Sequence, residues 1–370
     1  MNHKARSIVR HLISSGASNC LFVGGCVRDL FLKSPTKDID IEVYGLSYDQ
    51  IYSALTQLGN LSINKVGHSF GVITVDNEID ISVPRRENKI GIGHTDFDIE
   101  SDPDMSPKEA AMRRDFTINS VAMDIEGKLY DFFEGFDDIK HKILKATSNA
   151  FSEDPLRVLR GMQFISRFGF SVDPGTINMC KNISNEFRYL PKERVYAELV
   201  KWSYGKYPRL GLRFLLDTDW LKNFPLLNKL NNTLQDPEWH PEGNVFVHTS
   251  HVCDEASLIA TRNNMSDGYR LCLLMAALLH DIGKPDTTVL NDQERWISPK
   301  HDSVGGPLAK DFLLSIGSPN WLIDEVVPLV ENHMVHIGID IPSDKMLRRL
   351  AVRLGSSSIK MLSHLIEADH

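Results

Sequence analysis

The sequence predicts an α+β protein in which a mixed region of strands and helices comes first and two helical regions follow. Two observations predict this order. Up to about residue 145, short runs with apolar residues at every second position alternate with helical runs, as expected for a sheet with helices. From residue 154 onward apolar residues recur at helical spacing, and a polar, proline-containing break divides the helical part. We expect domains at residues 1–145, 146–235 and 240–370.

In the first domain, alternation of apolar and polar residues indicates strands. Residues 38–43 show it best, because three Ile or Val residues alternate with three acidic ones. The turn signal Glu126-Gly127 predicts a hairpin, and a short helix is expected at residues 27–32. Residues 85–107 are polar and rich in Gly and Asp, which predicts a mobile loop. The predicted strands are at residues 19–23, 38–43, 72–75, 79–83, 122–124 and 128–132.

The helical regions are predicted from spacing. Residues 269–280 form a strongly apolar helix that ends before Gly283 and Pro285, and residues 231–241 form the break that precedes it. The earlier helices are indicated by Leu156, Leu159, Phe164 and Phe168, and then by Val195, Leu199 and Trp202.

Composition excludes several classes of protein. Apolar residues make up 42% and charged residues 24% of the 370 residues, which excludes a disordered or fibrous chain. No stretch approaches about 20 apolar residues and no signal-peptide core follows the start, so we expect a cytoplasmic protein with no membrane partner. An odd number of cysteines without a C-x-x-C pair predicts reduced core thiols; these are Cys20, Cys26, Cys180, Cys253 and Cys272.

Charge is distributed unevenly along the chain. Residues 151–235 contain thirteen Lys/Arg and eight Asp/Glu, a net charge of +5, which leaves −13 for the remainder of a chain whose net charge is −8. A basic middle suits a polyanion held along one segment. A lysine-rich helical surface without a ligand explains the same numbers, and charge alone does not separate the two readings.

Asp38 and Asp40 are the first candidate catalytic residues. The chain has four D-x-D triplets, but only this pair lies on an alternating strand, where residues i and i+2 project to the same face. It also follows a glycine-rich turn and Arg28, which suit phosphate binding. Nucleotidyl transfer uses paired carboxylates to hold divalent ions. Asp80, on a strand of matching alternation, is a candidate third carboxylate.

Four sequence blocks occur in an order that resembles a known family. They are residues 21–29 (LFVGGCVRD) with 37–40 (KDID), residues 113–119 (RRDFTIN), residues 153–160 (EDPLRVLR) and residues 193–195 (ERV). Together they resemble the head signature, the ribose-sensing block, the nucleotide-selecting block and the neck-bracing motif of class II tRNA nucleotidyltransferases and bacterial poly(A) polymerases. The resemblance implies a polymerase-β-like nucleotidyltransferase head, a mixed sheet with helices, followed by an all-α neck and body.

The resemblance also implies a role for each matching residue. These roles are Mg²⁺ binding, triphosphate contact, ribose sensing and selection of C or A by a protein template. Asp38 and Asp40 are implied to bind Mg²⁺, and Gly25 and Arg28 to contact the triphosphate. Arg114 and Asp115 are implied to sense the ribose. Asp154 and Arg157 are implied to act as the template, with Arg160 as a further triphosphate or base contact.

Two of these positions have a second interpretation. Taken alone, Asp154 and Arg157 could be an ordinary i, i+3 salt bridge on a helix, and only the other blocks favour the template role. Where the family often has another arginine, this chain has Gln163, which weakens one phosphate contact.

Within the family, two segments favour tRNA over poly(A) activity. Residues 66–71 (VGHSFG) lack the paired basic residues usual in bacterial poly(A) polymerases. Residues 85–101, with Arg86, Glu87 and Lys89, resemble the flexible element by which CCA-adding members switch from C to A. The sequence therefore predicts CCA addition, with CTP, ATP and the tRNA acceptor stem as partners; an A-adding enzyme or a poly(A) polymerase is the alternative.

The C-terminal region resembles HD-type phosphohydrolases, all-α domains that bind metal ions. The resemblance rests on an H…HD…D pattern within an LLHDIGKP context and implies Mg²⁺ or a transition metal. The implied ligands are His248, His280, Asp281 and Asp369, with His301 and His333 for a second ion. Because Asp369 is the penultimate residue and chain ends fray, we expect the domain to be truncated or to bind metal poorly.

Two hypotheses of other kinds compete with CCA addition. One is an HD phosphohydrolase or 2′,3′-cyclic phosphodiesterase with a vestigial head, and the other is a non-catalytic RNA-binding module. The intact carboxylate pair and nucleotide-selecting block count against both.

Overall fold

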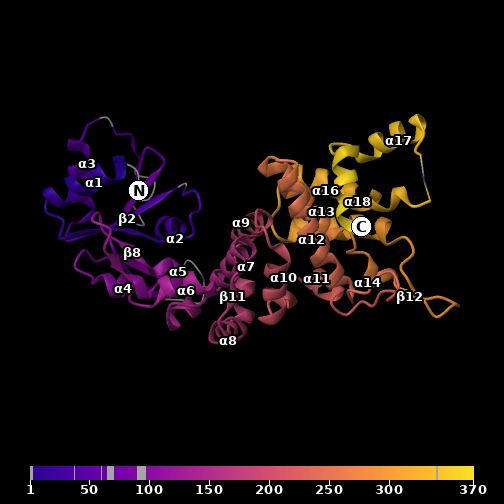
Figure 1. Ribbon diagram of the computed structural model, residues 1–370, viewed down its shortest axis with the longest axis horizontal. Helices are drawn as coiled ribbons and strands as arrows, with labels where there is room; N and C mark the ends of the chain where they lie inside the picture. Colours follow the sequence, from indigo (N-terminus) through magenta and orange to yellow (C-terminus); the bar gives the residue numbers. More distant parts are fainter. Residues whose placement is uncertain (1–2, 37, 60, 65–70, 90–96, 339–340) are drawn as a thin grey trace. The chain divides into compact units, whose positions relative to one another are not determined.

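The computed structural model describes residues 3–36, 38–59, 61–64, 71–89, 97–338 and 341–370 (Figure 1). The chain forms two compact units. The first comprises Met1–Arg157 and Ser171–Met179, and the second comprises Val158–Phe170 and Cys180–His370. The first contains a mixed sheet with helices and the second is almost entirely helical, so the predicted α+β class is confirmed.

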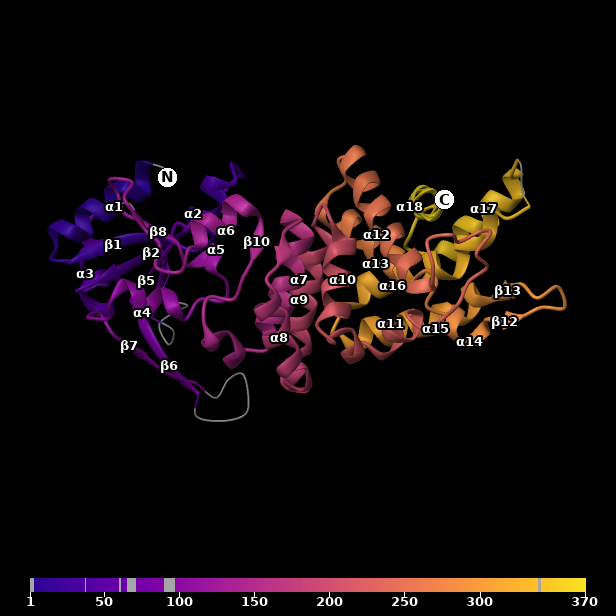
Figure 2. The same cartoon turned by 60° about the horizontal axis from the view of Figure 1, so that its bottom comes forward.

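A seven-stranded sheet forms the centre of the first unit (Figure 2). The strand order is β3-β4-β5-β2-β1-β8-β9, and only β2 and β5 are parallel neighbours among these strands. The six predicted strands all occur, with ends shifted by two residues at most. The strands are β1 (Asn19–Val23), β2 (Ile39–Tyr44), β3 (Ile63–Asn64), β4 (Val72–Val75), β5 (Ile79–Ser82), β8 (Ala122–Met123) and β9 (Leu129–Tyr130).

Alternation explains why β2 can carry a site. Its Ile and Val side chains are buried, whereas Asp40 and Glu42 are only partly buried, so the acidic residues share the opposite face. The helix α2 (Gly25–Phe31) begins two residues before the predicted one and packs on β1 and β2. The other helices of this unit are α1 (His3–Ser14), α3 (Tyr48–Gln57), α4 (Pro107–Met112), α5 (Thr117–Ser120), α6 (Gly135–His141) and the 3₁₀ helix η2 (Asn149–Glu153).

The prediction of a mobile loop at residues 85–107 was wrong for residues 85–89 and 97–101, which form strands. β6 (Arg85–Lys89) and β7 (Phe97–Ser101) form an antiparallel ladder, and α4 begins at Pro107. The strands have no apolar alternation to reveal them; backbone pairing and the opposite charges of Arg86 and Glu100, which are cross-strand partners, stabilise the ladder instead. Residues 90–96 and 66–70, which the sequence argument also used, lie outside the described residues.

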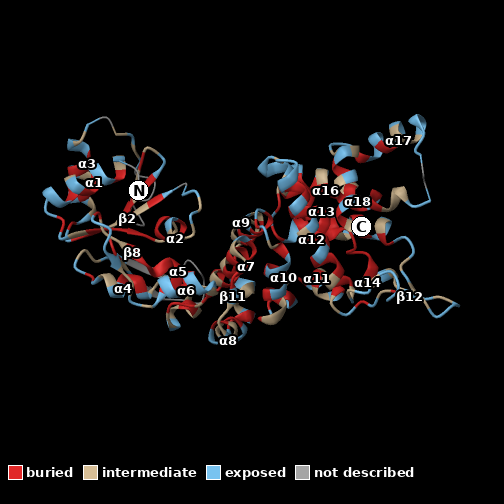
Figure 3. Ribbon diagram, in the orientation of Figure 1, coloured by how far each residue is buried: buried red, intermediate tan, exposed pale blue. Residues whose placement is uncertain are grey.

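The second unit packs its helices around α13 (Asp267–Leu279). Every residue from Leu271 to Leu279 is buried (Figure 3), because helices from several directions cover it. α12 (Val245–Arg262), α16 (Asn320–Asn332) and α18 (Ile359–Asp369) all contact α13. The strongly apolar helix predicted at residues 269–280 is thus confirmed, and its last turn ends at a core edge.

The remaining elements complete the helical part of the chain. The break expected at residues 231–241 lies between α11 and α12. These elements are β10 (Ile143–Leu144), α7 (Leu156–Phe168), β11 (Ser171–Val172), α8 (Pro174–Asn182), η3 (Ser184–Tyr189), α9 (Lys192–Ser203), α10 (Pro208–Asp217), η4 (Leu221–Asn223), α11 (Pro225–Leu230), α14 (Lys284–Thr287), β12 (Val289–Leu290), β13 (Trp296–Ile297), α15 (His301–Ser315), η5 (His333–His336) and α17 (Asp344–Leu354).

All five cysteines are buried and free, as expected for reduced core thiols.

Among the described residues, no helix combines the length and apolarity that a membrane span requires.

Candidate active sites

The carboxylates of the head meet on two parallel strands. Asp40 on β2 and Asp80 on β5 are register partners, although forty positions separate them. Thr74 on β4 donates its hydroxyl to Asp80 Oδ1 at 2.6 Å, which holds that carboxylate in place. Asp38 lies one residue before β2 and is exposed. The sheet therefore brings the three predicted catalytic residues to the ends of two adjacent strands.

The electrostatics of Asp40 suit a cation site. Burial raises the pKa of Asp40, the negative charge of Asp80 raises it further, and Arg114 opposes both; the resulting pKa is about 6. A carboxylate that resists ionisation beside another carboxylate is stabilised by a shared cation. Oxygen donors of this kind are the ligands that hard divalent ions prefer. The head residues thus fit a divalent metal ion.

Gly24 lets the chain pass close to this carboxylate. Its φ is +69°, a conformation that other residues rarely adopt. A Cβ atom at this position would lie 3.5 Å from Asp40 Oδ2. The turn between β1 and α2 therefore needs glycine for its backbone conformation, and it leaves main-chain atoms near the carboxylates.

Arg28 belongs to a buried network. The residue is 4% exposed. Its Nη2 lies 2.7 Å from Asp29 Oδ1, and its Nη1 donates to Asn119 Oδ1 at 2.6 Å. A Cβ on Gly25 would lie 3.3 Å from Arg28 Nη2. The two predicted triphosphate contacts are therefore neighbours, and protein groups already orient the guanidinium.

Arg114 and Asp115 each form a hydrogen bond with Asn119. Arg114 Nη1 donates to the main-chain carbonyl of Asn119 at 3.1 Å, and Asn119 Nδ2 donates to Asp115 Oδ1 at 2.9 Å. Asn119, the last residue of the RRDFTIN block, thus links both predicted ribose-sensing residues to Arg28. Sequence reasoning gave Asn119 no role, although its place in the block was a signal.

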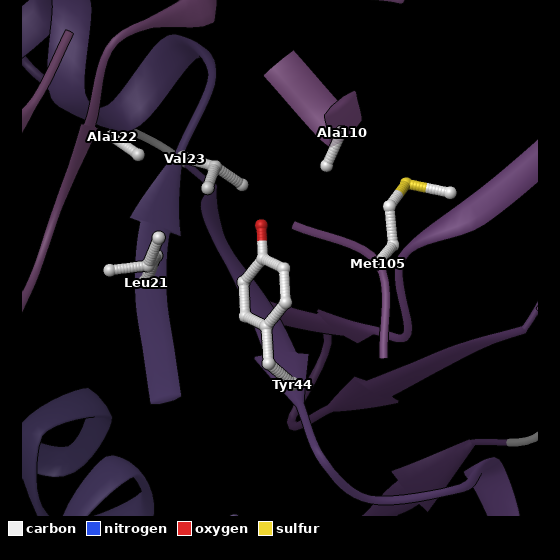
Figure 4. Packing of buried hydrophobic residues seen from close by; sticks show 6 residues of the cluster. All are labelled: Leu21, Val23, Tyr44, Met105, Ala110 and Ala122. Carbon is white, nitrogen blue, oxygen red and sulfur yellow. The ribbon is translucent and has the colours of Figure 1, made fainter. Parts of the chain in front are cut away.

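The sequence did not reveal a role for Glu42 or Tyr44 either. Arg114 Nη2 lies 3.2 Å from Glu42 Oε2, and the Tyr44 hydroxyl donates to the same oxygen at 2.7 Å. Tyr44 is 4% exposed and lies in a cluster with Leu21, Val23, Met105, Ala110 and Ala122 (Figure 4). The detectable signal was alternation, because Glu42 and Tyr44 follow Asp40 at i+2 and i+4.

Asp154 and Arg157 lie in the first unit. Asp154 Oδ1 accepts the main-chain N–H of Leu156 at 3.0 Å. Arg157 donates from Nη1 to the carbonyl of Ala150 at 2.6 Å and from Nη2 to the carbonyl of Arg113 at 2.8 Å. Arg157 thus ties the RRDFTIN block to η2.

Arg160 and Gln163 fall in the second unit. The Arg160 guanidinium lies 5.4 Å from the centre of the Phe164 ring. Gln163 is 2% exposed, and among the described residues its Oε1 has no hydrogen-bond partner.

All six residues of the predicted HD site come together in the second unit. Two triads have ligand atoms within 4.8 Å of one another: His248, His280 and Asp369, and Asp281, His301 and His333. They are adjacent, since His280 Nε2 lies 3.2 Å from Asp281 Oδ2. The side chains come from α12, the two residues after α13, the start of α15, the start of η5 and the end of α18.

Close approach of main-chain atoms fixes the centre of this site. A Cβ on Gly283, the residue before α14, would overlap the carbonyl oxygen of His301, so only glycine permits this close approach of the start of α15 to the start of α14. The same contact sets His301 beside Asp281, with Nε2 3.3 Å from Oδ1.

The hydrogen bonds of the imidazoles indicate a metal centre. The Nδ1 atoms of His280, His301 and His333 lie 2.8, 2.8 and 2.7 Å from main-chain carbonyls. Because a carbonyl only accepts, these nitrogens carry the proton and a neutral ring presents an Nε2 lone pair. The Nε2 atoms of His301 and His333 are only 3.0 Å apart, and buried His280 Nε2 has no hydrogen-bond partner among the described residues. Facing lone pairs of this kind fit a transition metal.

Groups of opposite charge lie close together in the buried HD site. Burial lowers the pKa of His280, but Asp281 and Asp369 outweigh it and raise the pKa to about 10. Burial and then the charge of His280 lower the pKa of His333 to about 4. Lys284 Nζ lies 2.7 Å from Asp281 Oδ2. The site therefore combines carboxylates, the cations Lys284 and His280 and the neutral imidazole of His333, and metal binding to His280 would release its Nε2 proton.

Two further residues flank the HD site. Glu242 Oε1 lies 2.9 Å from His248 Nδ1 and 3.1 Å from His240 Nδ1. Sequence reasoning missed both His240 and Glu242; the signal was the His-Pro-Glu run shortly before His248.

Comparisons with known proteins agree with the two sites. Residues 20–145 match the family model described as "Poly A polymerase head domain", and residues 245–368 match the HD domain model. The chain thus combines the head of a nucleotidyltransferase with an HD domain.

Whole-chain relatives refine this class. The chain is 34% identical over 339 residues to the "Multifunctional CCA protein" of Hahella chejuensis (strain KCTC 2396), covering 89% of this chain and 75% of the relative. It is 32% identical over 337 residues to the protein of that name from Shewanella frigidimarina (strain NCIMB 400), covering 88% and 76%. The chain therefore belongs to the family of multifunctional CCA proteins.

Solved structures share the fold. A CCA-adding enzyme from Bacillus stearothermophilus in complex with CTP superposes with a TM-score of 0.65 at 20% identity, covering 100% of this chain and 78% of that one. An apo form of a tRNA-processing enzyme gives 0.68 at 20% identity, covering 99% and 87%.

Proposed function

We propose that this protein adds C, C and A to the 3′ end of tRNA, using CTP and ATP without a nucleic-acid template. The observation that carries the proposal is the register pairing of Asp40 with Asp80 beside Gly24 and Arg114. The names of the relatives support CCA addition over A-only or poly(A) synthesis.

In the proposed reaction, the terminal 3′-hydroxyl oxygen of the tRNA attacks the α-phosphorus of the nucleotide. A new phosphodiester bond forms, the bond from the α-phosphorus to the bridging oxygen breaks, pyrophosphate leaves and the hydroxyl proton passes to solvent. Asp38, Asp40 and Asp80 would hold Mg²⁺, which would supply charge neutralisation and a more acidic hydroxyl. The protein's own share is positioning.

The nucleotide contacts are proposed from the network described above. Gly25 and Arg28 contact the triphosphate, and Arg114 with Asp115 reads the ribose. Asp154 and Arg157 present a carboxylate and a guanidinium to the base edge. A guanidinium has five N–H donors. Arg157 uses two of them for the carbonyls of Ala150 and Arg113, so donors remain for a base.

Arg160 and Gln163, which lie in the second unit, are proposed as further nucleotide-binding residues. Arg160 adds a cation for the triphosphate or base. Gln163 cannot replace the charge of an arginine, so we expect weaker nucleotide affinity than in relatives with arginine at this position.

The proposal is tested with tRNA transcripts that end before C, after CC and after CCA, given CTP and ATP separately and together. Growth that stops at CCA supports it. Addition of A only to CC ends identifies an A-adding enzyme, and unlimited A tails identify a poly(A) polymerase; either result contradicts the proposal.

The HD site supports a second activity, hydrolysis of phosphate from damaged RNA 3′ ends. The supporting observation is that six candidate metal-ligand side chains form two adjacent triads, with His280 Nε2 of one 3.2 Å from Asp281 Oδ2 of the other. Water would attack the phosphorus of a 2′,3′-cyclic phosphate, one ring P–O bond would break, and the leaving oxygen would take a proton. The product ends would then need a further hydrolysis before the head could extend them.

Two double variants separate the activities. Asp38→Asn/Asp40→Asn is expected to abolish nucleotide addition and to keep cyclic-phosphate hydrolysis. His280→Ala/Asp281→Ala is expected to do the reverse. If the wild-type protein hydrolyses no cyclic or terminal phosphate with Mg²⁺, Mn²⁺, Co²⁺ or Ni²⁺, the second activity is refuted.

A further inference from the structure

His248 differs from the other histidines of the HD site in what holds its ring. Main-chain carbonyls of Ala277, Ser298 and Val330 accept from the other three, each three residues earlier in the chain. His248 Nδ1 instead lies 2.9 Å from a side-chain carboxylate oxygen, Glu242 Oε1. This ligand is therefore the one whose orientation depends on a replaceable side chain.

The segment that carries Glu242 is well anchored. The main-chain N–H of His240 donates to the carbonyl of Asp236 at 2.8 Å. Asn244 caps α12 by accepting from the N–H of Val247 at 3.0 Å, and its side-chain amide donates to the carbonyl of Asn231 at 2.7 Å. The carboxylate is thus set by hydrogen bonds on both sides of it in the chain.

Both ring nitrogens of His248 are engaged. While Nδ1 faces Glu242, Nε2 lies 2.9 Å from Asp369 Oδ1 and 3.7 Å from Asp281 Oδ2. A proton on Nδ1, donated to Glu242, leaves the Nε2 lone pair directed at the other ligands. A carboxylate in this position fixes the tautomer and makes the imidazole a stronger ligand.

We propose that Glu242 is a positioning residue that holds His248 as a metal ligand. The inference rests on the proposed HD metal centre and extends it to a residue outside the ligand set. His240 packs edge-on against His248, with ring centres 4.7 Å apart, and shares the same carboxylate oxygen.

The test is a Co²⁺ titration of the whole protein, read from the visible absorption of imidazole-bound Co²⁺. Glu242→Ala removes both the acceptor and the charge, and we expect about 10- to 100-fold weaker Co²⁺ binding. Glu242→Gln keeps an oxygen that accepts from Nδ1, so it is expected to lose less. Glu255→Gln, an exposed carboxylate of α12 with no hydrogen bond or ion pair among the described residues, is the matched control and is expected to bind like wild type.

Nucleotide addition to tRNA is measured on the same samples as a folding control, because the head lies in the other unit. Co²⁺ binding that is unchanged in Glu242→Ala, with wild-type protein binding normally, overturns the inference alone. Wild-type protein that gives no imidazole-type Co²⁺ spectrum overturns the proposed HD centre instead.

Discussion

Burial beside a second carboxylate destabilises the ionised form of Asp40 in the folded protein. Its pKa of about 6, against an ordinary 3.8, reflects burial and the neighbouring Asp80. The unfolded chain loses its proton first, so the stability of the folded state falls as the pH rises from about 4 to about 6. Above pH 6 the ionised carboxylate costs folding on the order of 1–3 kcal/mol.

We therefore expect Asp40→Asn to be more stable than wild type at pH 7.5 with a chelator present, and no more stable near pH 4. The same variant is expected to lose at least about 10²-fold in kcat/KM, because a neutral amide holds a divalent cation less tightly than a carboxylate, and that cation would neutralise charge in the transition state. Thermal unfolding at both pH values and nucleotide incorporation check this. Equal stability gains at the two pH values would refute the electrostatic account.

Glu42 is expected to act on ribose selection. Its ion pair with Arg114, at 3.2 Å, holds that guanidinium beside the proposed sugar site. Glu42→Gln is expected to lower the kcat/KM ratio of CTP to dCTP about tenfold, equivalent to about 1.4 kcal/mol. Glu78→Gln, an exposed head carboxylate, should leave the ratio unchanged. A wild-type ratio in Glu42→Gln would exclude this role.

At the scale of elements, the close approach of the start of α14 to the start of α15 positions the HD residues. A Cβ on Gly283 would overlap the His301 carbonyl, so Gly283→Ala must push α15 away. We expect a loss of about 1–3 kcal/mol in the free energy of unfolding and weaker Co²⁺ binding, with nucleotide addition retained.

The control for this variant is Gly268→Ala in α13, where a Cβ would meet no atom within 4 Å. Unfolding and Co²⁺ titration are measured on both. If the two alanine variants behave alike, close approach at Gly283 does not hold the site.

Elements were predictable where burial is one-sided. β2, β4 and β5 bury alternate residues, and that pattern is visible in the sequence. The β6–β7 ladder was missed because its pairing uses main-chain groups and charged side chains such as Arg86 and Glu100, which follow no apolar period.

At the scale of the whole molecule, the basic span at residues 151–235 is expected to bind the tRNA backbone. Neutralised phosphates release counterions, so the KM for tRNA should rise steeply with salt. Lys181→Glu/Lys222→Glu changes two exposed lysines of the span and is expected to raise the KM for tRNA but not for CTP.

A matched variant outside the span, Lys345→Glu/Arg353→Glu, alters the net charge equally at exposed positions of α17. Steady-state kinetics at several salt concentrations compare the two. Equal rises in the KM for tRNA would show that total charge, and not the span, governs binding.

The local properties of this protein are determined by its sequence alone. Periodicity predicts strands and helices, because each residue's exposure follows from its place in a regular element. The motifs single out Asp38 and Asp40 as candidate catalytic residues and His280 and Asp281 as candidate metal ligands, because each pair lies in a short run of chain.

Only the tertiary structure decides which distant residues meet. The sheet order pairs Asp40 with Asp80. Packing of separate elements joins Glu42 to Arg114 across 72 positions of the chain and His248 to Asp369 across 121 positions. No local pattern encodes these contacts, since they depend on how buried faces of separate elements pack. The contacts on which the proposed roles of Glu42, Asn119 and Glu242 rest therefore appear only in the folded chain.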